Sequence, residues 1–548
     1  MLFLWAGCVT ISNDDLKLRR DLDQDGTPNA EDCAPEDPSI AIPEWWEDAD
    51  GDGFGGAAKS AKACEAPEGY VASSDDCDDT DPLSWPGAEE LCDNVDNDCN
   101  GDVDDAEEGN PWYANEVCRL AYDDATAHFV GEAAGDNAGG SIAGDLDHDG
   151  DGNVDVLIGA PEVGERAGAV YLLYGGIAPG EHGLDLADAT FAGGDDDRMG
   201  RRITAGDLDG DGADELVVPS LRETVSLAKD GAVYIVPGGE RRLGGQDFSD
   251  SVQLHGGSSW SRLGFGVELP GDITGDGVAD LVASSPYDAG DLGVVYVFPG
   301  PVSDGSSDDA EVTITGTIPG GGLGGRIYGV GDVTGDGQPD LVLGDELDGR
   351  AWLFAGPVSG DLDTDDADVE WVGPAQSTMS NALCAPGDWD GDGVMELIVG
   401  APSDSSGEDR GGSVFLVSAD VGSGLVTDLA TATFLGEAAG MNAGASIACD
   451  TDTNGDGTTD LLVGADFFGA NFNGAAMLVY GGAYQGSQPL LLADARVEGN
   501  PSAQLGGVVR FGGDLTGNGS PDLLIGATGE STNGQGSGGV ALISADWE

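Results

Sequence analysis

The chain has 548 residues, and its 103 acidic against 20 basic residues give a formal net charge of −83. Such a charge repels nucleic acid and anionic membrane surfaces, so we expect neither as a partner and expect cations as ligands. Glycine contributes 94 residues without a three-residue period, which excludes collagen and indicates many tight turns. We therefore expect a mainly β-stranded repeat protein.

The apolar start of the chain has features of an export signal. Its run MLFLWAGC ends in Ala6, Gly7 and Cys8 and resembles a bacterial lipoprotein signal, in which the cysteine carries a lipid. The run is short and has no basic residue, so either the true start lies upstream or Cys8 is an ordinary thiol. We interpret residues 1–8 as a truncated lipoprotein signal. The expected protein is exported and bacterial-type, either extracellular or held at the cell surface by a lipid on Cys8.

Residues 9–120 are predicted to form a loop-rich, acidic module held together by disulfides. This segment contains Cys33, Cys64, Cys77, Cys92, Cys99 and Cys118. An even number of cysteines in a short acidic segment indicates up to three disulfides, and therefore an oxidising compartment. The sequence leaves their pairing open.

Two stretches of this module have the acid spacing of calcium loops. Residues 21–32 resemble a thrombospondin type 3 calcium repeat, and residues 77–105 resemble the MopE-type metal-binding motif of bacterial surface proteins. The residues at the ligand spacing are Asp21, Asp23, Asp25 and Asp32 in the first stretch and Asp96, Asp98, Asn100 and Asp104 in the second. We expect one or more Ca²⁺ ions here, because the chain has only four histidines to favour copper.

One loop recurs seven times between residues 121 and 548, at intervals of roughly 60 residues, and such a period is typical of solenoids, propellers and arrays. Each copy approximates DxDxDGxxD and lies between two short apolar runs, the second of which reads VLIGAP in the first copy. A third run, GAVYLLYGG, and a fourth, more polar run, ATFAG, complete the repeat. Short runs rich in Val, Ile, Leu and Tyr between turn residues are strands, and four strands per repeat indicate a propeller blade.

The two ends of this segment predict a closed ring of seven four-stranded blades. The seventh repeat stops after its third strand, and the missing strand precedes the first loop at Thr126 to Gly131. We predict that residues 126–131 pair with the last blade, which removes an exposed edge. The order of an LGFG entry, an aspartate loop, a strand ending in GAP and a GAVY strand resembles the FG-GAP repeats of integrin α-subunits. This resemblance implies an all-β, seven-bladed β-propeller over residues 121–548.

Calcium accounts for the residue types of the repeated loop, because it takes roughly six to eight oxygen ligands and alternate residues of a loop point inward. Side chains at positions 1, 3, 5 and 9 supply oxygens, and glycine at position 6 permits the sharp turn. In repeat order the predicted ligands are Asp147, Asp149, Asp151 and Asp155; Asp207, Asp209, Asp211 and Glu215; Asp272, Thr274, Asp276 and Asp280; Asp332, Thr334, Asp336 and Asp340; Asp388, Asp390, Asp392 and Glu396; Asp452, Asn454, Asp456 and Asp460; and Asp514, Thr516, Asn518 and Asp522. We expect about seven Ca²⁺ ions, with the weakest site in the seventh loop, which has the fewest carboxylates.

The first copy of the loop permits two registers, because it contains two Asp-Gly pairs. With Gly152 at position 6 the ligands begin at Asp147, and Asp145 has no role. With Gly150 at position 6 the ligands begin at Asp145 instead. We prefer the first register, because it keeps the following VLIGAP run aligned with the other repeats.

Two more cysteines, Cys384 and Cys449, precede the loops of the fifth and sixth repeats. They fall on neighbouring innermost strands of the predicted propeller. They are either two buried small residues or a disulfide between blades.

The sequence favours a non-enzymatic, monomeric protein that binds a protein or glycan ligand, as in adhesion. It has no HExxH motif and no recognisable Ser-His-Asp or Cys-His set. Two alternatives stay open. The chain is the accessory or binding part of a carbohydrate- or lipid-active enzyme, or its first module sequesters metal.

Overall fold

The computed structural model describes Cys33, residues 42–51, 53–80 and 84–87, Cys99, Gly101, and residues 118–345, 349–469 and 471–544. Several predicted features lie outside these residues, namely the segment 1–8 with Cys8, Cys92, and all metal-ligand candidates of residues 9–120. Those candidates are Asp21, Asp23, Asp25, Asp32, Asp96, Asp98, Asn100 and Asp104. The chain divides near residue 118 into two compact units, which are described in turn.

The first unit contains a small antiparallel sheet. Its middle strand is β1 (Glu44–Glu47), which pairs with β2 (Ser60–Lys62) and with β3 (Tyr70–Val71). The indole Nε1 of Trp45 donates a 2.8 Å hydrogen bond to the carbonyl oxygen of Ala63, just beyond β2. This bond anchors an aromatic side chain in a sheet whose described residues are mostly half-buried or exposed.

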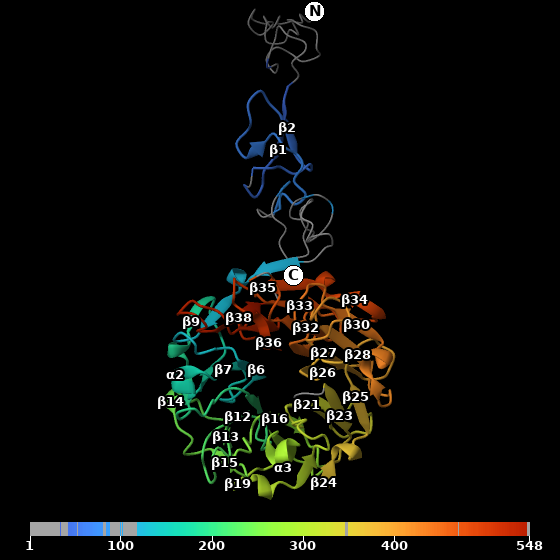
Figure 1. Cartoon of the computed structure of the whole chain (residues 1–548). Coiled ribbons are helices and arrows are strands. Elements are labelled where there is room, and N and C mark those ends of the chain that lie inside the picture. The colour runs from blue at the N-terminus through green and yellow to red at the C-terminus, as the bar shows by residue number, and fades with distance from the viewer. Residues whose placement is uncertain are drawn as a thin grey trace, which may run out of the picture. The chain divides into compact units, whose positions relative to one another are not determined.

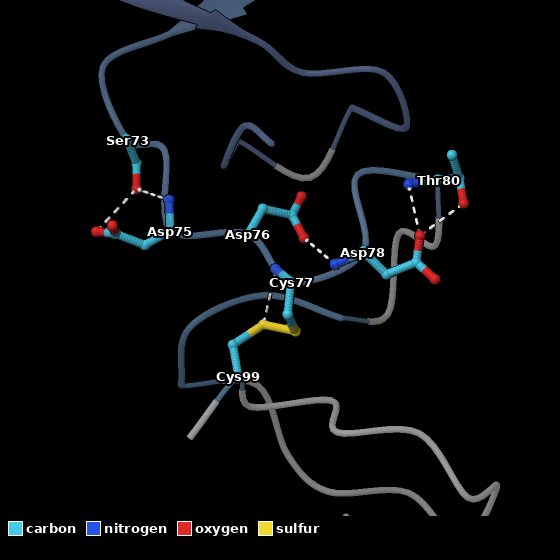
Figure 2. Close-up of a disulfide and its surroundings, with 7 residues drawn as sticks. All are labelled: Ser73, Asp75, Asp76, Cys77, Asp78, Thr80 and Cys99. Carbon is cyan, nitrogen blue, oxygen red and sulfur yellow. Dashed lines mark hydrogen bonds between the residues drawn. A yellow bond between two sulfur atoms is a disulfide. The ribbon is translucent and has the colours of Figure 1, made fainter. Parts of the chain in front are cut away.

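Disulfides join Cys33 to Cys64 and Cys77 to Cys99 in this unit. Figure 2 shows the second of them beside the aspartates of residues 75–78. These two bonds confirm the prediction that the cysteine-rich segment forms disulfides. A unit with a small apolar core depends on such cross-links, because they restrict its unfolded state.

The second unit consists of repeated β-sheets arranged like propeller blades. The described residues form seven five-stranded sheets, and in each of them the first four strands pair antiparallel in the predicted order. Figure 1 shows the first strands, such as β6, β16, β26 and β36, around a common centre, with the later strands of each sheet farther out. We number the sheets 1 to 7 by the chain order of these first strands.

The strands occupy equivalent places in every sheet. The first strands are β6 (Ser141–Leu146), β11 (Thr204–Gly206), β16 (Val267–Gly271), β21 (Arg326–Gly331), β26 (Ala382–Gly387), β31 (Ser446–Thr451) and β36 (Leu505–Phe511). The second strands are β7 (Asp155–Ala160), β12 (Glu215–Ser220), β17 (Asp280–Ser285), β22 (Asp340–Gly344), β27 (Glu396–Ala401), β32 (Asp460–Ala465) and β37 (Asp522–Ala527). The third strands are β8 (Ala169–Leu173), β13 (Ala232–Val236), β18 (Val294–Phe298), β23 (Arg350–Phe354), β28 (Ser413–Ser418), β33 (Ala475–Val479) and β38 (Gly539–Ser544). The fourth strands are β10 (Ala189–Ala192), β15 (Val252–His255), β20 (Val312–Thr315), β25 (Val369–Val372), β30 (Ala432–Leu435), β35 (Ala495–Glu498) and β5 (Ala127–Val130).

The prediction of four-stranded blades was incomplete, because each sheet has a fifth strand. The fifth strands are β14 (Gly244–Gln246), β19 (Gly305–Ser306), β24 (Gly360–Asp363), β29 (Gly424–Leu425), β34 (Gly486–Pro489), β4 (Cys118–Ala121) and β9 (Gly180–Gly183). In sheet 1, for example, β14 pairs parallel with β10 although it belongs to the connection before β15 of sheet 2. The fifth strand therefore covers the outer edge of one sheet with backbone from the next.

The connections outside the strands contain only short helical turns in the described residues. The α-helical turns are α2 (Val163–Arg166), α3 (Asp288–Asp291) and α4 (Val426–Leu429). The 3-10 turns are η1 (Tyr122–Asp124), η2 (Leu184–Leu186), η3 (Ser307–Asp309), η4 (Thr364–Asp366) and η5 (Leu490–Leu492). Among the described residues, no helix has both the length and the apolar character that a membrane span requires.

The last sheet combines both ends of the second unit. Strand β5 (Ala127–Val130) pairs antiparallel with β38, and Phe129 lies opposite Val540. On its other side β5 pairs parallel with β9. The pairing predicted for residues 126–131 is confirmed, because β5 supplies the strand that the seventh repeat lacks.

The apolar core lies between neighbouring sheets. The second strands of all seven sheets are buried along their whole length, because they have a strand on each side and a sheet on each face. Leu157 and Leu172 of sheet 1 share one buried cluster with Val218 and Tyr234 of sheet 2. Each such aliphatic side chain contributes roughly 1.5 to 3 kcal/mol of burial free energy, so the sheets hold one another in place.

Candidate metal sites

The seven predicted metal loops connect the first and second strands of the seven sheets. Each loop turns twice at glycine with a positive φ. At position 6 the φ angles of Gly152, Gly212, Gly277, Gly337, Gly393, Gly457 and Gly519 lie between 84° and 99°. At position 4 those of Gly150, Gly210, Gly275, Gly335, Gly391, Gly455 and Gly517 lie between 71° and 81°. The glycine at position 4 was missed in the sequence reasoning, although its recurrence in every copy was a visible signal.

The aspartate at position 1 holds the backbone of each loop in this shape. In sheet 1, Asp147 accepts hydrogen bonds from the backbone nitrogens of Asp151 at 3.0 Å and Gly152 at 2.9 Å. Asp207 of sheet 2 accepts from its own positions 5 and 6 in the same way, at 3.1 Å each. This match places Asp147 at position 1, in agreement with the preferred register. Asp145 lies before the loop, on β6.

The acid at position 9 is the first residue of the second strand and is buried in every sheet. The residues are Asp155, Glu215, Asp280, Asp340, Glu396, Asp460 and Asp522, each at most 4 % exposed. The carboxylate of Asp155 accepts hydrogen bonds from the backbone nitrogens of His148 and Gly175, at 3.0 Å each. Burial raises the pKa of Asp155 to about 6 and that of Glu396 to about 7. A buried negative charge of this kind is stabilised by a bound cation.

In four of the loops, three carboxylates approach closely enough to share one ion, with one oxygen of each lying within 4.8 Å of the others. The groups are Asp147, Asp149 and Asp155; Asp207, Asp209 and Glu215; Asp272, Asp276 and Asp280; and Asp388, Asp390 and Glu396. The predicted carboxylates of the other three loops form no such group among the described residues. These are Asp332, Asp336 and Asp340 in sheet 4, Asp452, Asp456 and Asp460 in sheet 6, and Asp514 and Asp522 in sheet 7.

The position 5 aspartates of sheets 1, 2 and 5 are not part of these groups. They are Asp151, Asp211 and Asp392, and each accepts a hydrogen bond from the backbone nitrogen two residues further on. In sheet 1 a cation of the protein already contacts the group, because Nη1 of Arg241 lies 3.2 Å from an oxygen of Asp149. The sites therefore differ in the number of carboxylates available to a metal.

The loop of sheet 3 has oxygens that fit a bound cation. Oδ1 of Asp280 and Oγ1 of Thr274 are buried and form no hydrogen bond with any described residue. The other oxygen of Asp280 accepts a 2.8 Å hydrogen bond from the backbone nitrogen of Thr274. Leaving such oxygens unpaired costs about 1 to 3 kcal/mol each, and a hard cation with oxygen ligands removes that cost.

A further group near a cysteine does not offer thiolate ligands. Asp76 lies close to Cys77 and Cys99, but the two sulfurs are joined in a disulfide. Oδ1 of Asp76 accepts a 2.8 Å hydrogen bond from the backbone nitrogen of Asp78, as Figure 2 shows. The oxidised sulfurs staple the loop and leave the aspartates as the metal-type ligands of this segment.

The structure decides the pairing of the two late cysteines. Cys384 on β26 and Cys449 on β31 form a disulfide between the first strands of sheets 5 and 6, with their Cα atoms 6.0 Å apart. The alternative of two free buried thiols is therefore wrong. Together with the two bonds of the first unit, this disulfide fits an exported protein.

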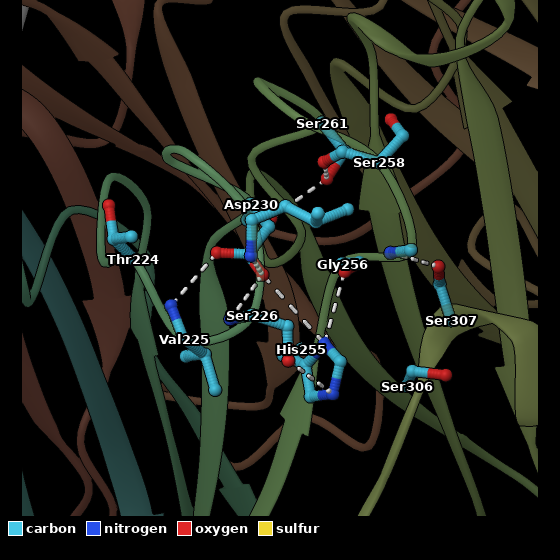
Figure 3. A network of polar contacts seen from close by, with 12 residues as sticks. Thr224, Val225, Ser226, Asp230, His255, Gly256, Ser258, Ser261, Ser306 and Ser307 are labelled. Atoms are coloured by element: carbon cyan, nitrogen blue, oxygen red, sulfur yellow. Dashed lines mark hydrogen bonds and ion pairs between the residues drawn. The ribbon is translucent and has the colours of Figure 1, made fainter.

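A serine and an aspartate of one loop of sheet 2 lie near a histidine at the end of β15, an arrangement that sequence inspection did not reveal (Figure 3). Oγ of Ser226 lies 3.4 Å from Nε2 of His255, and Nδ1 of His255 lies 3.8 Å from Oδ2 of Asp230. His255 Nδ1 has a nearer acceptor in the carbonyl oxygen of Gly256 at 3.0 Å.

The carboxylate of Asp230 is already bound to the backbone of its own loop. It accepts hydrogen bonds from the backbone nitrogens of Val225, Ser226 and Leu227 at 2.8 to 3.0 Å. A catalytic aspartate bonds directly to its histidine, which the 3.8 Å separation does not achieve. We assign Asp230 as the residue that holds the loop 224–230 in place.

Comparison with known proteins identifies the repeats. Residues 199–236 and 268–298 match the FG-GAP repeat family, and residues 332–399 match the FG-GAP-like repeat family. Residues 76–105 match the family described as "Putative metal-binding motif", which is of the MopE type.

Individual relatives share parts of the chain. Integrin alpha-PS2 of Drosophila melanogaster is 27 % identical over 38 % of this chain and 15 % of its own length. Phosphatidylinositol-glycan-specific phospholipase D of Homo sapiens is 32 % identical over 28 % of this chain and 19 % of its own length. The chain thus spans less than a fifth of either relative. The solved structure of Sqt1 from Chaetomium thermophilum has a TM-score of 0.36 and 13 % identity, covering 74 % of this chain and 82 % of its own.

Proposed function

We propose that the chain is an exported, calcium-binding β-propeller. It carries FG-GAP repeats and a MopE-type metal-binding motif, and it is homologous to integrin α-subunits. Its role is to bind a protein or glycan partner, as in adhesion, without catalysing a reaction. The observation that carries the proposal is the gathering of three carboxylates in each of four equivalent loops. Calcium fits these loops better than magnesium, because oxygen ligands from a flexible loop suit its irregular shell.

The proposed propeller is closed and has seven blades. Seven consecutive sheets of the same strand order support this count. The pairing of β5 with β38 supports closure, because it joins the first strand of the repeat region to the last. In this arrangement the metal loops lie at one end of the blades, since every loop connects a first to a second strand.

The partner is proposed to bind at the opposite end of the blades. Trp260, in the connection between β15 and β16, is 52 % exposed, and Nζ of Lys229 lies 5.5 Å from the centre of its ring. Lys229 and Arg222 both pair with Asp196, at 2.6 and 3.0 Å. An exposed tryptophan beside ordered charged side chains is typical of the residues that dominate binding energy in interfaces.

The proposed location is the cell exterior. Three disulfides among the described residues require oxidising conditions. A lipid on Cys8 is the proposed means of attachment to the cell surface, by resemblance of residues 1–8 to a lipoprotein signal.

A second candidate role is that of a binding domain for a lipid-active enzyme. It is favoured by the match to a phospholipase D over 28 % of the chain. In this case the chain binds the lipid or glycan substrate and another domain or protein performs the chemistry.

Metal analysis tests the proposed function directly. The purified chain, dialysed against calcium-free buffer with and without prior addition of CaCl₂, is assayed by atomic emission and by calorimetric titration. We expect at least four Ca²⁺ ions per chain, one for each group of three carboxylates, and weaker binding of Mg²⁺. A chain that retains no calcium contradicts the proposal. A glycan array probed with wild type and with Trp260→Ala then tests the binding role, and a signal that survives this substitution contradicts the proposed surface.

A further inference from the structure

The first strands of the seven sheets enclose a cavity of about 650 Å³. Four arginines line it, although the whole chain has only 20 basic residues. They are Arg201 and Arg202 before β11, Arg326 at the start of β21, and Arg510 on β36. We call these four residues the arginine cluster. It comes from three different sheets, so no local stretch of sequence reveals it.

Three of the four arginines have no direct contact with a carboxylate that the structure describes. Among the described residues, no ion pair includes Arg202, Arg326 or Arg510. Arg326 donates to neutral oxygens instead, namely the carbonyl oxygen of Asn381 at 2.8 Å and its Oδ1 at 2.5 Å. Arg510 donates to the carbonyl oxygen of Val509 at 2.9 Å. These bonds orient the guanidinium groups of Arg326 and Arg510 toward neutral oxygens.

The other three arginines of the cluster repel the charge of Arg202. Repulsion from Arg326, followed by burial, lowers the pKa of Arg202 to about 9. Four carboxyl groups also line the cavity, those of Asp145, Glu268, Asp450 and Asp466. Burial raises the pKa of Glu268 to about 7, and Asp466 accepts a 2.8 Å hydrogen bond from Nδ2 of Asn442. Asp145 and Asp450 are exposed. The structure thus holds like charges together at a cost that an anion would remove.

We propose that this cavity binds an oxyanion group, a sulfate or a phosphate, through the arginine cluster. The planar fork of a guanidinium matches two oxygens of such a group, and arginines from three sheets that line one cavity favour it over a halide. The cavity volume is in the range of small-molecule sites, so the group fits either as a free ion or as the ester of a sugar. This site goes beyond the proposed function, which requires only the metal loops and the outer surface around Trp260.

Sulfate is the suitable probe, because phosphate precipitates calcium. The calcium-loaded full chain is dialysed to equilibrium against radiolabelled sulfate, with the ionic strength held constant by NaCl. We expect saturable binding of about one sulfate per chain, weakened about ten-fold or more by Arg202→Gln, because a charge-assisted hydrogen-bond pair is lost. Arg510→Gln provides a second variant from another sheet, and its binding is measured independently of how Arg202→Gln folds.

The matched control is Arg350→Gln. Arg350 pairs with Glu370 on the neighbouring strand and does not line the cavity, so its substitution should leave sulfate binding unchanged. Absence of saturable binding in the wild type overturns the proposal, as does an equal loss in folded Arg510→Gln and Arg350→Gln. Competition by glucose 6-sulfate identifies the source: stronger competition than by free sulfate indicates a sulfated glycan, and equal competition indicates the free ion.

Discussion

The loops of sheets 3 and 7 differ at only one of their four predicted ligands, and only the loop of sheet 3 gathers its carboxylates. Both have aspartate at positions 1 and 9 and threonine at position 3, but position 5 is Asp276 in sheet 3 and Asn518 in sheet 7. The backbone is held identically in both, since Asp276 and Asn518 each accept from the nitrogen two residues on, at 2.9 and 2.8 Å. The amide of Asn518 turns to the hydroxyl of Ser544 instead of joining a metal group.

This comparison separates the shape of the loop from its capacity for metal. Glycines and backbone hydrogen bonds set the shape, because they recur in every loop. The side chains then decide how many charges converge. Sheet 4 adds a second condition: it has the residue types of sheet 3, but Thr334 Oγ1 donates to Asp340 at 3.4 Å, whereas the equivalent oxygens of sheet 3 are unpaired. In this pair of loops, the difference lies in whether the position 9 carboxylate accepts a hydrogen bond from the hydroxyl at position 3.

Removal of calcium from all loops is expected to have the largest effect. A site saturated at a hundred times its Kd stabilises the native state by about 2.7 kcal/mol, so several sites together shift the melting temperature by ten degrees or more, as an order of magnitude. Scanning calorimetry with calcium, with EDTA, and with EDTA followed by excess calcium measures this shift. If calcium stabilises the fold, the third scan restores the first, and an EDTA scan identical to the calcium scan contradicts this role.

Removing the acid at position 9 tests whether the loops of sheets 3 and 7 differ in metal binding or in backbone hydrogen bonding. Asp280→Ala loses the 2.8 Å hydrogen bond from the backbone nitrogen of Thr274. Asp522→Ala loses the equivalent bond from Thr516 at 2.9 Å and a second one from the Thr516 hydroxyl at 3.3 Å. We expect Asp280→Ala to cost about 3 kcal/mol or more in calcium and Asp522→Ala about 1 to 2 kcal/mol. Urea unfolding of both variants in calcium and in EDTA provides the values. Equal costs in calcium would mean that sheet 3 gains nothing from a metal.

The pH dependence of the metal-free protein tests the buried acids themselves. The folded-state pKa values of Asp155 and Glu396, about 6 and about 7, lie above the ordinary values of these side chains, so the native state binds more protons than the unfolded state. Stability in EDTA should therefore be greatest near pH 4 to 5 and fall as the pH rises through 6 to 7, by roughly 1 to 3 kcal/mol. Calcium, which needs the ionised carboxylates, should reverse this trend. Urea unfolding from pH 5 to 8 checks both slopes, and a rise in EDTA would contradict the first.

The smallest expected effect comes from exchanging the residues at position 5, the one predicted ligand that differs between the loops of sheets 3 and 7. Asp276→Asn should remove one bound calcium, and Asn518→Asp should add one or strengthen a weak site, each by about ten-fold in Kd because one ligand charge changes. Calorimetric titration of the two variants and of the double exchange measures the number of ions. We expect the double exchange to restore the wild-type number, and two variants with unchanged titrations would show that position 5 does not determine affinity.

The sequence by itself determined the repeat, the position of every aspartate loop and the strand that completes the last sheet. These features are local: a loop of aspartates and glycines has one low-energy shape, and a run such as AHFV in β5 has the pattern of the strand it replaces. In the preferred register of the first loop, Asp147 accepts the same backbone hydrogen bond from position 6 as Asp207 does in the second.

Only the tertiary structure decided the features that join distant residues. The fifth strands, the disulfide between Cys384 and Cys449, and the arginine cluster depend on how neighbouring sheets approach each other. The same holds for the loops that gather carboxylates, since a hydrogen bond from Thr334 in one loop and an unpaired Thr274 in another distinguish identical residue types. Sequence spacing fixes the order of side chains along the chain. Ligand groups and charge clusters depend on the distances between residues that are far apart in the sequence.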